Sequence, residues 1–236
     1  LLLGLLVSYY VNPLTGIFAS GIYAVLPYSI YFGRTILPET FTVFWSLASL
    51  YLLTRFEKND RSSWGWIAGA AVSGAIALLA KPMAIFLLVP APYILWKKFS
   101  FSGRFVVCLF AYLLICLFPL WWWRQWILQF PEGIPVNEWL LNAGNIRFKG
   151  AWFYWLFAKR LGELILGYWG ILPFGLGLLV TPSQKEGWLY RWWAIGAVAY
   201  FVVIARGNVQ HDYYQILLLP VVAVYAAKGF VFLLTG

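Results

Sequence analysis

Long uncharged apolar blocks alternate with short polar breaks along most of this sequence. The blocks run for roughly 15 to 20 residues, the length that a helix needs to cross a hydrocarbon core about 30 Å thick. Lipid satisfies no backbone hydrogen bonds, so the pattern predicts an all-α fold, a polytopic transmembrane helical bundle of about eight to nine spans. After a partial first span, the expected spans lie near residues 14–33, 39–55, 64–80, 82–96, 105–123, 161–180, 189–205 and 213–234.

The break at Lys81-Pro82 decides how two of these blocks are connected. A single helix from Trp64 to Trp96 would be about 50 Å long and would place a lysine and a proline in mid-bilayer, so we expect a hairpin instead. Residues 1–236 then form one transmembrane domain, with an outer-face loop at 124–160. Leu1 to Val7 is already apolar, so we expect a fragment that lacks the first spans and the first outer loop.

Composition agrees with a membrane protein: 63% of the residues are hydrophobic, 11% are charged, and the mean hydropathy is +0.78. A soluble domain carries about 25% charged residues. The net charge of +9 comes from 17 scattered lysines and arginines, which fit helix ends and anionic lipid better than a phosphate-tracking patch. The expected partner is therefore membrane lipid, with no nucleic acid.

Alternating spans assign each connection to one of two membrane faces. The first face receives Asn12-Pro13, 55–61, 97–104, 185–191 and Lys228; the second receives 34–39, Lys81-Pro82, 124–160 and 206–214. With the long 124–160 segment set aside, nine lysines and arginines lie on the first face against three on the second. The excess predicts that the first face is cytoplasmic.

Two breaks on the second face carry isolated ionisable groups. Glu39 follows Pro38 at a helix start, where it either pairs with Arg34 as an ordinary first-turn carboxylate or faces a watery cavity. Lys81 has no acid within twenty residues, and either extends to the interface or binds an anionic headgroup.

The densest polar cluster runs from Arg206 to Tyr214 and contains the only histidine, His211. Tyr213 and Tyr214 fit a binding site or an interfacial aromatic belt. The 124–160 segment mixes basic, amide and aromatic residues, which fits either helices in the membrane interface or a structural cap. No phosphate-binding glycine loop and no metal-ligand spacing occurs, so the sequence predicts no metal site.

Three features in this order make the sequence resemble the protein O-mannosyltransferase and aminoarabinose-transferase family of the GT-C superfamily. They are Gly33-Arg34 through Pro38-Glu39, the Gly74 to Leu79 block ending in Ala80-Lys81-Pro82, and His211-Asp212-Tyr213-Tyr214 with Leu217-Leu218-Leu219-Pro220.

The resemblance implies a GT-C-like glycosyltransferase of the prokaryotic cell (inner) membrane with its active face outward. It would move a sugar from a polyprenyl-phosphate donor to a lipid, glycan or protein acceptor, with no other cofactor and an open question of divalent metal. Glu39 would be the second acidic group at the sugar, and the principal base would lie upstream of Leu1, leaving the fragment inactive. The substrate-binding residues would be Arg34, Lys81, Arg206, His211, Tyr213 and Tyr214.

Two other hypotheses stay open. A transporter or flippase of lipid-linked or anionic substrates would place its polar groups near mid-membrane on broken helices, often in two related halves. A scaffold subunit would carry no chemistry at all.

Overall fold

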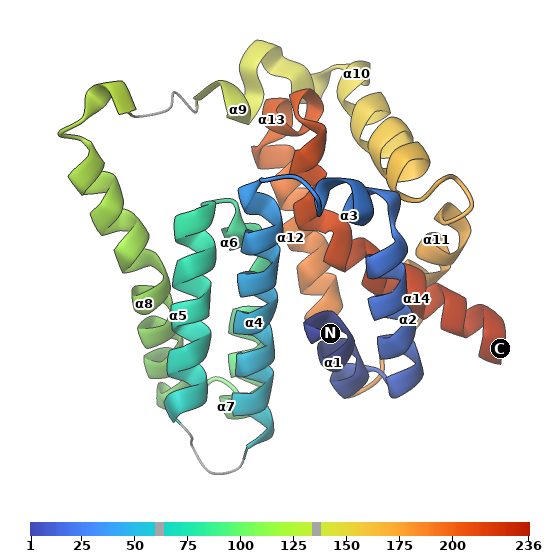
Figure 1. Ribbon diagram of the computed structural model, residues 1–236. Helices are drawn as coiled ribbons and strands as arrows, with labels where there is room; N and C mark the ends of the chain where they lie inside the picture. The colour runs from blue at the N-terminus through green and yellow to red at the C-terminus, as the bar shows by residue number, and fades with distance from the viewer. Residues whose placement is uncertain (60–63, 134–137) are drawn as a thin grey trace.

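The computed structural model describes residues 1–59, 64–133 and 138–236, and within these ranges every regular element is a helix (Figure 1). The all-α prediction is thus confirmed for the described part of the chain. Asp60 and Arg61, assigned above to one face, and Asn137 of the outer-face loop lie outside the described residues.

Helices in the first half of the chain extend from the left of Figure 1 to the right of its centre. They are α1 (Leu2–Tyr10), α2 (Pro13–Val25), α3 (Pro27–Phe32), α4 (Pro38–Lys58), α5 (Trp64–Ala80), α6 (Ala84–Leu87), α7 (Ala91–Phe99) and α8 (Gly103–Ile127).

The second half begins with short elements and ends with longer helices. They are η1 (Pro131–Gly133), α9 (Glu138–Asn142), η2 (Ala143–Phe148), α10 (Gly150–Phe153), the π-helical η3 (Tyr154–Ile165), α11 (Ile171–Leu179), α12 (Leu189–Val203), α13 (Ala205–Gln210), η4 (Asp212–Leu218) and α14 (Leu219–Thr235).

Several expected spans are broken in the structure. The 14–33 block divides into α2 and α3 before Pro27, and the 82–96 block divides into α6 and α7 around Pro90, because proline removes a backbone donor and restricts the residue before it. The 161–180 block bends at Gly167 and Tyr168, which both have positive φ. By contrast, α5 coincides with the expected 64–80 span and ends immediately before Lys81, after which the chain turns back.

Within the described part of the chain, two helical stretches are long and apolar enough to cross a membrane, Gly103–Ile127 and Asp212–Thr235. The count of eight to nine spans therefore stays a prediction. The two stretches differ in environment: 78% of the apolar window in the second is buried in the protein, but only 17% of that in α8. The C-terminal helix thus belongs to the core, and α8 presents most of its surface to the surroundings.

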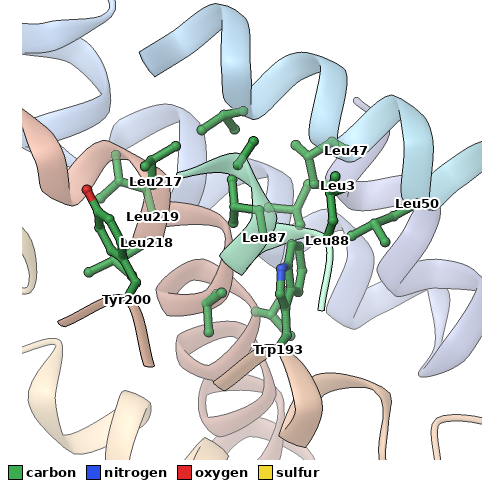
Figure 2. Close-up of a cluster of buried hydrophobic side chains, with 14 of the residues drawn as sticks. Leu3, Leu47, Leu50, Leu87, Leu88, Trp193, Tyr200, Leu217, Leu218 and Leu219 are labelled. Atoms are coloured by element: carbon green, nitrogen blue, oxygen red, sulfur yellow. The ribbon is translucent and has the colours of Figure 1, made fainter. Parts of the chain in front are cut away.

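The buried core lies where the short helix α6 is enclosed by longer ones. Figure 2 shows Leu87 and Leu88 in one cluster with Leu50 of α4 and Trp193 of α12, and Leu218 of η4 lies in the same view. Because α6 spans only one turn, it fits between the larger helices and brings the turn at Lys81-Pro82 close to η4.

Candidate functional site

The candidate site forms where α4 begins and α5 ends. Pro38 opens α4 and places Glu39 in its first turn, where the helix dipole favours an anion. Lys81 follows the last residue of α5. Since α4 and α5 pack side by side, the two residues meet although they are 42 positions apart.

Glu39 and Lys81 form a buried ion pair in which Lys81 Nζ donates to Glu39 Oε1. Glu39 is fully buried and Lys81 is 8% exposed. The structure therefore corrects the pairing of Glu39 with Arg34 and the interpretation of Lys81 as a lysine that extends to the interface. A pair this deep is costly to desolvate and is held together by its own attraction.

An aromatic cover lies over the ammonium group of Lys81. Nζ is 3.7 Å from the ring centroid of Tyr214 and 5.6 Å from that of Tyr213. An aromatic face attracts a cation at such distances, so both tyrosines act on Lys81 and are more than interfacial aromatic residues.

His211 lies behind these tyrosines. Its ring centroid is 5.2 Å from those of Tyr213 and Tyr214 and 5.6 Å from that of Trp139. Its neighbour Asp212 faces another way, with a carboxylate oxygen 3.7 Å from Arg160 of η3. His211 thus supports the aromatic cover by packing, and it forms no pair with Asp212.

A buried amide pair fixes the segment that carries the tyrosines. Gln215 Nε2 donates to the backbone oxygen of Asn208 at 2.8 Å and to its Oδ1 at 3.0 Å, while Asn208 Nδ2 donates to the backbone oxygen of Ile204 at 3.0 Å. Both amides are fully buried. The sequence placed Asn208 in the polar cluster from Arg206 to Tyr214 but did not pair it with Gln215, because an amide side chain gives no sign of its partner.

A cavity of about 450 Å³ opens beside the ion pair. Glu39, Lys81, Tyr213 and Tyr214 line it, and so does Arg124, a cation at the end of α8 that the sequence did not single out. Apolar side chains complete the walls: Leu37, Leu79, Met83, Leu120, Trp123, Leu140, Leu141 and Ile204. The cavity is therefore apolar, with two cations and one carboxylate.

Two residues assigned to the site lie elsewhere. Arg34 is exposed and does not line the cavity. Arg206 lines a separate hollow of about 330 Å³ with Trp139, Gly144 and Gln210. The structure thus brings together Glu39, Lys81, Tyr213 and Tyr214, places His211 behind them, and leaves the two arginines apart.

Burial affects the pKa of the lysine in this pair. Loss of solvent lowers the pKa of Lys81, which lies in the turn beyond the end of α5, and the neighbouring carboxylate of Glu39 opposes that shift. Glu39 Oε2 is buried and has no hydrogen-bond partner among the described residues. That oxygen is available to accept a hydrogen bond from a bound molecule.

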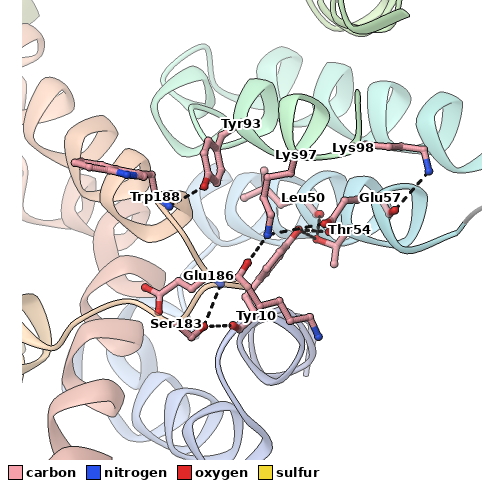
Figure 3. Close-up of polar contacts among 11 residues, drawn as sticks. Tyr10, Leu50, Thr54, Glu57, Tyr93, Lys97, Lys98, Ser183, Glu186 and Trp188 are labelled. Atoms are coloured by element: carbon pink, nitrogen blue, oxygen red, sulfur yellow. Dashed lines mark hydrogen bonds and ion pairs between the residues drawn. The ribbon is translucent and has the colours of Figure 1, made fainter. Parts of the chain in front are cut away.

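A second polar cluster lies at the opposite end of the bundle (Figure 3). The hydroxyl of Tyr10 donates to Glu57 at 3.0 Å, and Lys97 Nζ is 3.8 Å from the same carboxylate. Lys228, assigned above to a connection on this face, lies within α14 and is buried, with Nζ donating to Glu186 at 2.6 Å. Lys228 therefore lies inside a helix and not in a connection, and its partner Glu186 belongs to the 185–191 connection assigned to the same face.

Among residues 1–59, 64–133 and 138–236, no group of three or more His, Cys, Asp and Glu side chains is arranged to hold a metal ion. The ionisable groups that meet at the cavity are a carboxylate and two cations. This set is suited to binding an anion next to a hydroxyl-bearing ligand.

Comparison with known proteins gives one family. The model of the dolichyl-phosphate-mannose-protein mannosyltransferase family matches residues 1–126, from α1 into the last turn of α8, and these residues include both members of the ion pair. No curated protein and no solved structure matches the chain. The match covers more than half of the 236 residues, and the chain belongs to the dolichyl-phosphate-mannose-protein mannosyltransferase family.

Proposed function

We propose that this membrane mannosyltransferase takes its sugar from a polyprenyl-phosphate donor whose phosphate binds at Lys81. The observation that carries the proposal is the buried ammonium of Lys81, held by Glu39 under the ring of Tyr214, at the edge of the 450 Å³ cavity. A cation kept out of water interacts strongly with an arriving phosphate.

The chemistry needs a cation at the leaving group. Transfer breaks the bond between the sugar C1 and the phosphate oxygen, and the bonding electrons stay on that oxygen, so the polyprenyl phosphate gains one negative charge. The acceptor hydroxyl forms the new bond to C1 and loses its proton to a base. Lys81, with Arg124 on the cavity wall, would stabilise the growing charge.

Glu39 has two roles in this proposal. While the cavity is empty, its carboxylate compensates the charge of Lys81, so the protein does not bury an isolated cation. Once phosphate draws the ammonium away, Oε2, which has no partner in the described structure, accepts a hydrogen bond from a sugar or acceptor hydroxyl. Glu39 is thus the second acidic group at the reacting sugar.

The remaining assignments follow from position. Tyr213 and Tyr214 would contact the donor, and His211 would hold them in place. Arg34 and Arg206 lie farther from the pair, so we expect milder effects from their substitution. The acceptor would be a protein, lipid or glycan on the outer face of the membrane, on which the 206–214 segment lies in the proposed topology.

Membranes that contain the full-length enzyme test the proposal. Transfer of labelled mannose from polyprenyl phosphate mannose is measured for Lys81→Ala, Glu39→Gln and the control Lys149→Ala, which removes an exposed lysine. Loss of a charge-stabilising donor costs about 10²–10³ in rate, and we expect that loss for Lys81→Ala. Wild-type transfer by Lys81→Ala, at equal protein level, would contradict the proposal. The transporter alternative has no support from the family match.

A further inference from the structure

A large apolar groove lies on the side of the bundle formed by α8 and α12. It has a volume of about 820 Å³, and the α6–α7 segment forms its floor. Leu78, Leu88, Leu113 and Leu117 line its inner part. The groove is distinct from the Lys81 cavity, and its size and lining suit an aliphatic chain.

The end of the groove near Trp96 is aromatic. Trp96 and Phe101 lie on one side of it, and Trp188 and Trp192 on the other. The backbone N–H of Trp188 donates to the hydroxyl of Tyr93 at 2.8 Å, which joins the start of α12 to α7 (Figure 3). Tryptophans gather at membrane surfaces, so this end of the groove opens at the membrane face opposite Lys81.

Two arginines flank this opening. Arg104, at the start of α8, precedes the lining residue Phe105 and is exposed. Arg191 lies over the ring of Trp188, with Cζ 4.6 Å from the ring centroid. Among the described residues neither arginine has an acidic partner within 4.0 Å, so the mouth of the groove carries uncompensated positive charge.

The indole of Trp96 adds an independent observation. Its Nε1 is buried and has no acceptor among the described residues. Trp45, Trp152 and Trp193 also have an unpartnered Nε1 among the described residues, but of these four indoles only Trp96 lines the groove. An acceptor from a molecule bound in the groove would supply the partner that a buried tryptophan N–H normally has.

We propose that the groove binds one anionic phospholipid from the leaflet opposite the Glu39–Lys81 pair. One acyl chain lies along the leucines, the phosphate lies near Arg104 and Arg191, and an ester or phosphate oxygen accepts from Trp96. A prenyl chain of the sugar donor would fill the same space but would leave both arginines and the indole without partners. The charge at the mouth therefore favours a phospholipid, and the proposal does not depend on mannosyl transfer.

Native mass spectrometry of the purified chain tests the site. The probes are phosphatidylglycerol and phosphatidylcholine with the same palmitoyl and oleoyl chains, and a polyprenyl phosphate as competitor. We expect one phosphatidylglycerol to be retained at least tenfold more tightly than phosphatidylcholine. The double variant Arg104→Gln/Arg191→Gln should lose about tenfold to thirtyfold in phosphatidylglycerol affinity, since each arginine near anionic lipid contributes measurably.

Matched variants separate the groove from the general charge of this face. Arg55→Gln/Lys58→Gln removes two cations from the same face but away from the groove, and should retain the lipid. Leu117→Trp fills the groove without changing charge and should abolish retention, while Trp96→Phe removes only the indole donor and should weaken it severalfold.

Thermal unfolding identifies any variant that fails to fold. If Leu117→Trp fails to fold, the conservative Trp96→Phe still tests the groove. Equal retention of both phospholipids would overturn the proposal, as would equal losses in the two double variants. Stoichiometric displacement of phosphatidylglycerol by polyprenyl phosphate would assign the groove to the donor tail instead.

Discussion

Lys81 is the central residue of the candidate site, and each of its contacts affects the charge or the accessibility of its ammonium group. Glu39 balances its charge, Tyr214 covers it, and the cavity exposes it to a ligand. A lysine in such surroundings changes its proton affinity readily, whereas arginine stays charged.

Tyr214 provides a direct test of the aromatic cover. Replacing it by phenylalanine keeps a ring over Nζ, while leucine removes the ring but keeps an apolar side chain. A cation–π contact at a desolvated site contributes about 1–2 kcal/mol, so Tyr214→Leu should weaken donor binding by roughly tenfold and Tyr214→Phe much less. The KM for the donor measures this, and equal values for the two variants would rule the contact out.

The pH dependence of transfer follows from the burial of Lys81. Burial lowers its pKa, so the ammonium loses its proton at a lower pH than an exposed lysine would. As pH rises through that pKa, the proposed donor phosphate would lose its cation, so we expect kcat/KM to fall.

The variant Lys81→Arg should abolish this alkaline fall in kcat/KM, at a lower overall activity, because arginine cannot be deprotonated but has a different shape. The exposed Lys149→Arg serves as the control and should keep the wild-type profile. An alkaline limb that persists unchanged in Lys81→Arg would assign it to another group.

The sequence placed Glu39, Lys81, Tyr213 and Tyr214 on one membrane face but did not pair Glu39 with Lys81. Lys81 has no acid near it in the chain, so its partner depends on how α4 and α5 pack. Arg124 and the Asn208–Gln215 pair were missed for the same reason. Only the fold brings them to the site.

At the scale of elements, two glycines allow α11 and α14 to pack closely. A Cβ at Gly229 would lie 1.7 Å from the backbone oxygen of Pro173, and one at Gly177 would lie 1.8 Å from that of Tyr225. Glycine alone permits this approach, which is how small residues pack helices in membranes.

Gly229→Ala should therefore destabilise the protein, since the backbone on the facing helix must move. Overpacking of this kind costs about 1–3 kcal/mol of unfolding free energy. Thermal unfolding in detergent micelles measures the loss. Gly175→Ala is the matched control, because a Cβ there meets no atom within 4 Å. Comparable stability of the two variants would show that the contact is looser than described.

The apolar pattern predicted where the helices lie better than it predicted whether each helix is continuous. The 64–80 block became α5, but prolines within the 14–33 and 82–96 blocks ended helices that hydropathy alone would continue. The proline rule was visible in the sequence, whereas the bend at Gly167 and Tyr168 requires backbone angles that composition does not reveal.

At the scale of the whole molecule, Glu186 and Lys228 connect the segment before α12 to the middle of α14. Both side chains are at most 3% exposed. The apolar pattern could place α14 as a helix, but it could not reveal that a lysine inside it is neutralised from a different part of the chain.

Replacing one member of this pair leaves a buried charge. Lys228→Met should destabilise the protein by about 3–5 kcal/mol, whereas the double variant Glu186→Leu/Lys228→Met should recover most of that loss. Chemical or thermal unfolding of the three proteins measures the difference. A double variant no more stable than Lys228→Met would argue against the pair as the cause.

The central place of α14 also bears on biosynthesis. This 17-residue helix packs against α2 and α11, with the ring centroids of Phe230 and Phe18 6.3 Å apart, yet the ribosome makes it after both of them. During translation the face of α2 that packs against α14 is therefore exposed to lipid until α14 has been made. A nonsense codon after Leu218 would leave that face open while the residues of the ion pair are already made, and quality-control proteases would remove the product.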